Sequence, residues 1–178
     1  DGPSYIPPHG SFAATADVGG LFTNAAAGEY AIRWEVDGGA AETTVRVLTP
    51  ADYYPYRLLH DSVYNEWGLH LYGEEGVMGD GLGRAAVKAG KVLVPKLAAL
   101  IAERREAPIE GSEDAAIGAT YGWRVCDFAG ILLCEIWGMP PGELRSRDPS
   151  ERDERLLGLS YYYKLHASEY GSPTQGKY

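Results

Sequence analysis

Positive charge is scarce in this sequence of 178 residues. Its 16 lysines and arginines stand against 25 aspartates and glutamates, which gives a formal net charge of -9. A nucleic-acid groove or a surface for anionic membranes requires a concentration of lysine and arginine. We therefore expect no nucleic acid among the partners of this protein.

Long apolar runs are also missing. No stretch of about 18 or more uncharged apolar residues occurs, so the sequence predicts no transmembrane segment. No basic segment followed by an apolar one opens the chain, as a signal peptide would. Because the first residue is Asp1 rather than methionine, we expect a processed product or a fragment that has lost any signal peptide.

Cysteine is rare, with only Cys126 and Cys134 in the chain. Both lie in one strongly helical stretch, where eight positions correspond to about 12 Å along the helix axis. That separation is too large for a disulfide, so we expect both to be buried and to act as small apolar residues. Cysteine usage leaves the redox compartment open.

A change in composition divides the chain near Thr49 and Pro50. Residues 1–49 combine Gly, Ala and Thr with alternating aromatic or β-branched positions, whereas residues 50–170 carry apolar residues at helical spacing. We expect residues 171–178 to be a disordered tail. The sequence thus predicts an α+β protein in which a small antiparallel β segment precedes an all-α domain.

Two stretches of the first segment alternate between apolar and polar residues, as strands with one buried face do. Asp37, Gly38 and Gly39 between them suit a tight hairpin turn. A similar alternation over residues 11–17 predicts a further strand, so we expect about three. The inward positions of the hairpin are Tyr30, Ile32, Trp34, Val36, Ala41, Thr43, Val45 and Val47.

The run from Gly28 to Ile32 resembles the start of strand F in immunoglobulin-like β-sandwiches. In that pattern a small residue precedes a corner tyrosine, here Tyr30, and an inward core residue follows it. This sequence departs from the pattern at Ala26, where an acid is frequent, and at Ile32, where a cysteine is usual. The resemblance is thus to a cysteine-free strand pattern.

The resemblance implies an incomplete sandwich, with residues 11–17, 29–37 and 41–48 as strands E, F and G. A complete domain of this kind has about seven strands. Its apolar face needs cover from the helices, from upstream sequence or from another chain, and we expect the helices to pack on Trp34. The alternative is a small sheet that packs on its own helices.

The second segment is predicted to be helical over four stretches. Gly90 and Pro95 should kink or divide the second stretch, and Asp148, Pro149 and Glu151 supply an N-cap, a first helical residue and a capping box for the last. The stretches cover residues 54–70, 84–105, 121–137 and 149–167.

The third stretch is apolar around most of its circumference, which is typical of the centre of a bundle. We expect Phe128 and Leu132 in the middle of the core, and Arg124 and Asp127, three residues apart, to form an intrahelical ion pair. Residues 83–100 and 124–136 resemble the paired helices of HEAT-type repeats. That resemblance implies a scaffold or a binding surface.

One group of residues suggests metal chemistry. Glu66 and His70 are four residues apart and share a helical face, which suits two ligands of one metal ion, and His60 lies ten residues before His70. No HExxH or other paired metal motif completes the set. An ordinary surface pair of Glu66 and His70 is the alternative.

Tyrosine is abundant, with 13 residues in the chain. Tyr161, Tyr162 and Tyr163 are consecutive on the last helix and therefore span more than one face, so at least one should be exposed. Exposed tyrosine is favoured at protein interfaces. Arg124 could in addition anchor a ligand carboxylate.

Together these features predict a non-enzymatic, exported protein that acts as a scaffold or binds other proteins, with no cofactor. Its expected location is extracytoplasmic, either periplasmic or secreted. The alternative is a small metal-dependent hydrolase or metal-binding protein that uses Glu66 and His70. The oligomeric state is left open.

Overall fold

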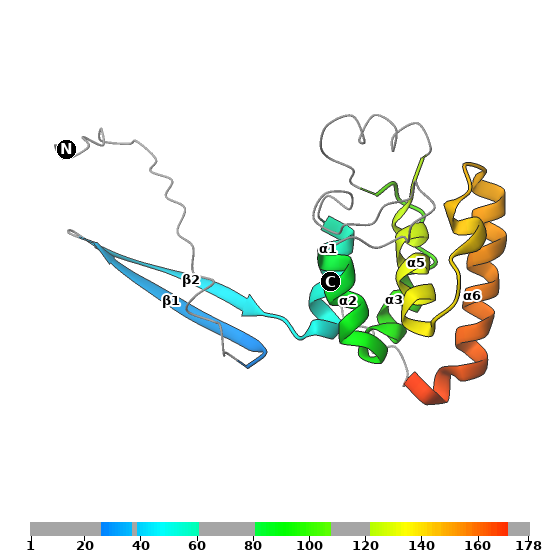
Figure 1. Ribbon diagram of the computed structural model, residues 1–178. Coiled ribbons are helices and arrows are strands. Elements are labelled where there is room, and N and C mark those ends of the chain that lie inside the picture. The colour runs from blue at the N-terminus through cyan, green and yellow to red at the C-terminus, as the bar shows by residue number, and fades with distance from the viewer. Residues whose placement is uncertain (1–25, 37–38, 61–80, 108–121, 171–178) are drawn as a thin grey trace. The chain divides into compact units, whose positions relative to one another are not determined.

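The computed structural model describes residues 26–36, 39–60, 81–107 and 122–170, although not the side chains of residues 34–36 (Figure 1). It is a mixed α+β structure and mostly helical, as the sequence predicts. Contacts divide the chain into two compact units, Asp1–Val47 and Leu48–Tyr178. The expected third strand over residues 11–17, the helical residues 61–70 and the tail 171–178 lie outside the described residues.

The first unit contains a β-hairpin of strands β1 (Gly28–Val36) and β2 (Gly39–Val47). The strands are antiparallel, and Tyr30 faces Val45 in a register that the alternating pattern requires. Tyr30 and Val45 are half-buried, whereas Arg33 and Glu42 on the opposite face are exposed. The hydroxyl of Tyr30 also donates a hydrogen bond to the carbonyl of Ala26 over 2.7 Å.

The second unit begins with α1 (Pro50–His60), which starts four residues before the expected position. Thr49 explains the difference, because its hydroxyl accepts a hydrogen bond from the backbone N–H of Asp52 over 3.2 Å. Thr49 is thus the N-cap of α1, and Pro50 occupies the first helical position, where its missing N–H costs nothing.

The predicted interruption at Gly90 and Pro95 is confirmed. The segment divides into α2 (Leu82–Ala89), the 3₁₀ helix η2 (Gly90–Leu93) and α3 (Val94–Leu100). Pro95 lies in the first turn of α3, where proline is tolerated.

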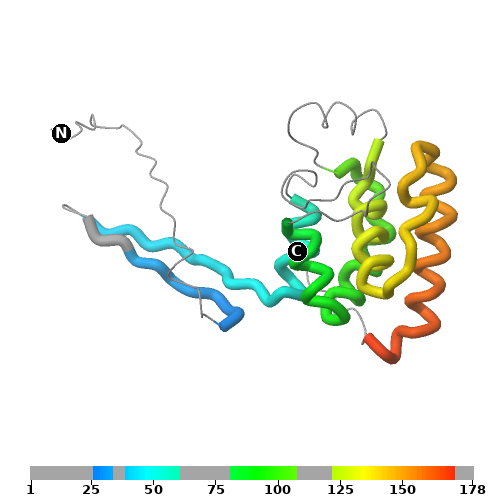
Figure 2. The backbone as a smooth tube through the Cα atoms, viewed as in Figure 1, coloured from blue at the N-terminus to red at the C-terminus, as the bar shows by residue number. Residues whose placement is uncertain are grey.

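Helix α5 (Val125–Trp137) is the centre of the second unit and contacts α1, α2, α3 and α6 (Figure 2). It begins later than the sequence pattern predicts because Arg124 is an extended N-cap residue. Gly138 ends the helix in the left-handed conformation with φ of 66°, which favours glycine. Phe128 and Leu132 are fully buried, as expected.

The 3₁₀ helix η3 (Gly142–Arg145) leads into α6 (Pro149–Tyr170), which packs along η3 and α5 (Figure 1). The carboxylate of Asp148 accepts a hydrogen bond from the N–H of Ser150 over 2.8 Å, so it caps α6 as predicted. The predicted capping box is replaced by a different arrangement: the backbone N–H of Asp148 donates to the hydroxyl of Ser146 over 3.1 Å, and Glu151 accepts a hydrogen bond from that hydroxyl.

No helix in the described part of the chain is both long and apolar enough to cross a membrane.

Candidate protein-binding face

Helix α6 carries apolar side chains on two opposite faces. Its inward face buries Leu156 and Leu159 against α5 and η3. Its outward face exposes Leu157, Tyr161 and Leu165, of which 71%, 64% and 62% of the surface is accessible. Residues four apart on a helix are neighbours, so these three side chains form one row, here called the outer stripe.

The outer stripe is unusual for an exposed helix face. Single exposed apolar residues are normal on protein surfaces, but a continuous apolar patch of roughly 300–600 Å² often marks an interaction site. The outer stripe is also the only place among the described residues where three exposed large apolar side chains follow one another at helical spacing. It is therefore the strongest candidate for a contact surface in the described part of the chain.

The sequence predicted a binding role for Tyr161, whereas the exposure of Leu157 and Leu165 is seen only in the structure. The signal was present, because the spacing of 157, 161 and 165 is regular. It was hidden by a second apolar row, which includes Leu156, Leu159 and Tyr163, at comparable spacing on the same helix. Only packing shows which row is buried.

The two other predicted tyrosines, Tyr162 and Tyr163, make packing contacts within the second unit. Tyr162 stacks on His166 with ring centroids 4.3 Å apart and contacts Trp137 at 4.8 Å. Tyr163 packs against the core, and burial raises the pKa of its hydroxyl. Tyr161 is therefore the exposed member of the three.

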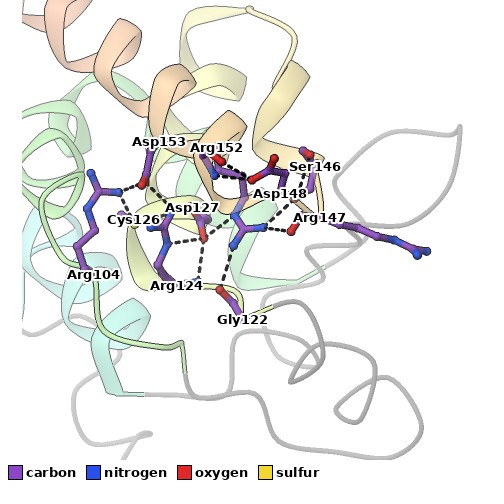
Figure 3. Close-up of polar contacts among 11 residues, drawn as sticks. Arg104, Gly122, Arg124, Cys126, Asp127, Ser146, Arg147, Asp148, Arg152 and Asp153 are labelled. Atoms are coloured by element: carbon purple, nitrogen blue, oxygen red, sulfur yellow. Dashed lines mark hydrogen bonds and ion pairs between the residues drawn. The ribbon is translucent and has the colours of Figure 1, made fainter.

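A buried charged network holds the N-terminal half of α6 (Figure 3). The side chains of Arg152 and Asp127 are fully buried, and Arg152 Nε donates to Asp127 Oδ2 over 3.1 Å. The guanidinium also lies 4.5 Å above the ring of Trp123, a cation–π contact. Three further N–H groups donate to the backbone carbonyls of Ser146, Arg147 and Gly122 at 2.8, 3.2 and 3.0 Å.

Arg124 belongs to the same network (Figure 3). Its predicted pair with Asp127 is confirmed, with Nη2 and Oδ1 2.9 Å apart, and a second pair joins it to Asp153 at 2.8 Å. The hydrogen bond to Asp127 is the largest cause of the raised pKa of Arg124. A ligand carboxylate at Arg124 would compete with Asp153, so the ligand role of Arg124 stays a prediction.

A hollow of about 430 Å³ lies beside the outer stripe and is lined by residues of η3 and α6. Arg155 donates to the carbonyl of Pro140 over 2.7 Å, and its Nε lies 4.0 Å from the carboxylate of Glu143. The lining residues are Glu143, Glu151, Glu154, Arg155 and Gly158. The hollow is therefore predominantly acidic.

The predicted metal ligands are only partly described. His60 is the last residue of α1 and is exposed, with its ring 4.5 Å from that of Tyr56. Glu66 and His70 lie outside the described residues, and within the described ranges no three His, Cys, Asp or Glu side chains form a metal-binding group. The metal site stays a prediction.

Comparisons of the chain with protein-family models, with curated proteins and with solved structures give no match. The interpretation of the outer stripe therefore depends on the residues and their packing.

Proposed function

We propose that this chain is a non-enzymatic protein-binding module whose contact surface is the outer stripe of α6. The observation that carries the proposal is the exposure of Leu157, Tyr161 and Leu165 in one row opposite the buried face of the same helix. Leaving this row in water forgoes the free energy of burying three large side chains, about 1.5–3 kcal/mol for each. Contact with another protein recovers part of it.

The contacts that hold α6 in place at both ends support a binding role. Arg152 ties the first turn of α6 to α5 and to the preceding loop, and the rings of Trp137 and Tyr162 pack together near its other end. A partner therefore meets a helix that is already ordered. Such preorganisation removes an entropic cost from binding.

The hairpin of the first unit carries a feature that fits the same function. Tyr30 donates to the carbonyl of Ala26, four residues upstream, which is the kind of bond that a corner tyrosine makes in immunoglobulin-like sandwiches. This likeness supports an exported scaffold in which the hairpin belongs to a sandwich-like sheet. A third strand and a bundle or HEAT-like arrangement of the helices form part of the same proposal.

Site-specific photocrosslinking tests the binding face in cells that produce the chain. A photoreactive residue replaces Tyr161 in one variant and Lys88, an exposed residue of α2, in the control. We expect covalent adducts with protein from position 161 and few from position 88. Equal yields at the two positions, or none at 161, would contradict the proposal.

A further inference from the structure

The outer stripe has an acidic flank. Glu154 precedes Leu157 by three residues, and Gly158 precedes Tyr161 by three, so the hollow that Glu154 and Gly158 help to line borders the stripe directly. Glu143, Glu151 and Glu154 bring three carboxylates to the hollow and Arg155 brings one guanidinium, which leaves two negative charges in excess.

Arg155, the one positively charged residue that lines the hollow, already has partners within the chain. Arg155 donates to the carbonyl of Pro140 and lies within 4.0 Å of Glu143. Its charge is therefore directed towards the wall formed by η3 and the loop before it. Glu151 and Glu154 are exposed residues of α6 and remain accessible to a cation that arrives from solvent.

Gly158 leaves room for such a group. A Cβ atom at this position would meet no other atom within 4 Å, so the glycine is not required by packing inside the chain. A glycine in a helix interior costs about 1 kcal/mol relative to alanine. Its small size lets a long side chain from outside approach the backbone of α6 between the stripe and the two glutamates.

We infer that the outer stripe binds an amphipathic helix that carries lysine or arginine along one flank of its apolar face; this inference rests on the proposed function. The stripe runs over nine residues, from Leu157 to Leu165, or about 12 Å of helix axis, which matches the i and i+4 apolar rows of a second helix. A lysine or arginine of that helix lays its aliphatic stem over Gly158 and its charge against Glu151 and Glu154.

The charge of the stripe's surroundings disfavours a second copy of this chain as the occupant. In an antiparallel pair of identical helices related by a two-fold axis, like flanks face each other. In such a pair centred on Tyr161, Glu154 lies opposite Ser168 and close to Glu169 of the other copy, so the acidic flank meets a further carboxylate. The formal net charge of -9 adds a repulsion between copies and an attraction for a basic partner.

The test measures the binding of three synthetic helical peptides to the whole chain at moderate salt by isothermal titration calorimetry. The peptides share one leucine face and carry lysine, glutamine or glutamate on the other positions. We expect the leucine–lysine peptide to bind most tightly and the leucine–glutamate peptide to show no binding. The Leu157→Ser/Leu165→Ser variant should lose binding of the lysine peptide.

Charge variants separate this inference from the proposed function. The variant Glu151→Gln/Glu154→Gln should bind the leucine–lysine peptide about tenfold more weakly than the wild type. The control Glu103→Gln/Glu106→Gln removes the same charge outside α6 and should change the affinity for this peptide less than about twofold. Thermal melting checks that every variant is folded.

Each outcome decides between the two ideas. If the lysine and glutamine peptides bind equally well and both need Leu157 and Leu165, the outer stripe is a binding face, and the inference of a basic partner is wrong. If no peptide binds, or if the lysine peptide binds the serine variant as well as the wild type, both are overturned. A dimer of the chain seen by analytical ultracentrifugation, and lost in the serine variant, would also overturn the inference while keeping the binding face.

Discussion

Arg152 and Asp127 meet across 3.1 Å with both side chains fully buried, although they are 25 residues apart in the sequence. Asp127 lies in the first turn of α5 and Arg152 in the first turn of α6, so the pair joins the starts of two helices. Removing both charges from water is expensive, and their attraction offsets that cost only because further donors and acceptors surround them. The three backbone carbonyls that accept from Arg152 meet this requirement.

The first prediction concerns this pair. Asp127→Ala leaves the buried guanidinium of Arg152 without its carboxylate and should lower the free energy of unfolding by about 3–5 kcal/mol. The double variant Asp127→Leu/Arg152→Met removes both charges. Its loss in the free energy of unfolding should be smaller than the sum of the losses of Asp127→Leu and Arg152→Met measured singly. Urea denaturation measures both. A loss below about 1 kcal/mol for Asp127→Ala would show that the pair contributes little.

The second prediction concerns acid stability. Hydrogen bonding to Arg124 is the largest cause of the lowered pKa of Asp153, and nearby Arg104 acts in the same direction. Because the folded pKa lies below the ordinary value of about 3.9, the stabilisation is complete above that value and is lost as the pH falls through the folded pKa. Thermal melting of the wild type should therefore show a steeper loss below about pH 4 than that of Asp153→Asn.

The control for this prediction is Glu154→Gln, since Glu154 lies on the same helix and forms no ion pair with other described residues. Its melting curve should follow that of the wild type on acidification. Asp148, whose pKa is lowered by its hydrogen bonds to Ser150, keeps its contribution in every variant. Parallel acid profiles for Asp153→Asn and the wild type would contradict the assignment to Asp153.

The third prediction compares two glycines inside helices. A Cβ atom at Gly130 would lie 2.8 Å from Leu156 Cδ2 and 3.0 Å from Leu144 Cδ1, so Gly130→Ala forces buried side chains apart. We expect a loss of about 1–3 kcal/mol in the free energy of unfolding. Gly158→Ala meets open space and should instead gain up to about 1 kcal/mol from helix propensity. Chemical denaturation of both variants tests the contrast, which fails if their effects have the same sign.

The fourth prediction concerns the two free cysteines, which are both buried as the sequence suggested. Burial raises the pKa of Cys126 to about 11 and also raises that of Cys134. Since the thiolate is the reactive species, alkylation by iodoacetamide at pH 8 should be at least about a hundredfold slower in the native chain than in urea. Single Cys126→Ser and Cys134→Ser variants identify which thiol reacts. Rapid labelling of the native chain at either position would contradict the described packing.

The elements that the sequence predicted well depend on neighbours along the chain. The hairpin register follows from a two-residue alternation around Tyr30 and Val45, and the break at Gly90 and Pro95 follows from the backbone properties of these two residues. The burial of Phe128 and Leu132 follows from a helix that is apolar on most of its circumference. Each of these features is decided within a few residues.

The start of α5 could not be predicted in this way. The apolar pattern extends back to Tyr121, but the helix begins at Val125 because Arg124 adopts an extended conformation. There the backbone N–H of Arg124 donates to Asp127 over 2.9 Å, while its side chain reaches Asp153 on α6. A contact with a residue 29 positions away leaves no local signal in the sequence.

The sequence by itself determined that α6 is a helix, that its cap is Asp148, and that apolar residues occupy two of its faces. Only the tertiary structure decided which row is buried, because Leu144 and the glycine at position 130 shape a surface that receives Leu156. The same packing encloses Arg152, which the sequence shows merely as one charge among many in the first turns of the helix. Burial depends on surfaces brought together from distant parts of the chain, and so the exposure of Leu157, Tyr161 and Leu165 is a property of the fold rather than of the local sequence.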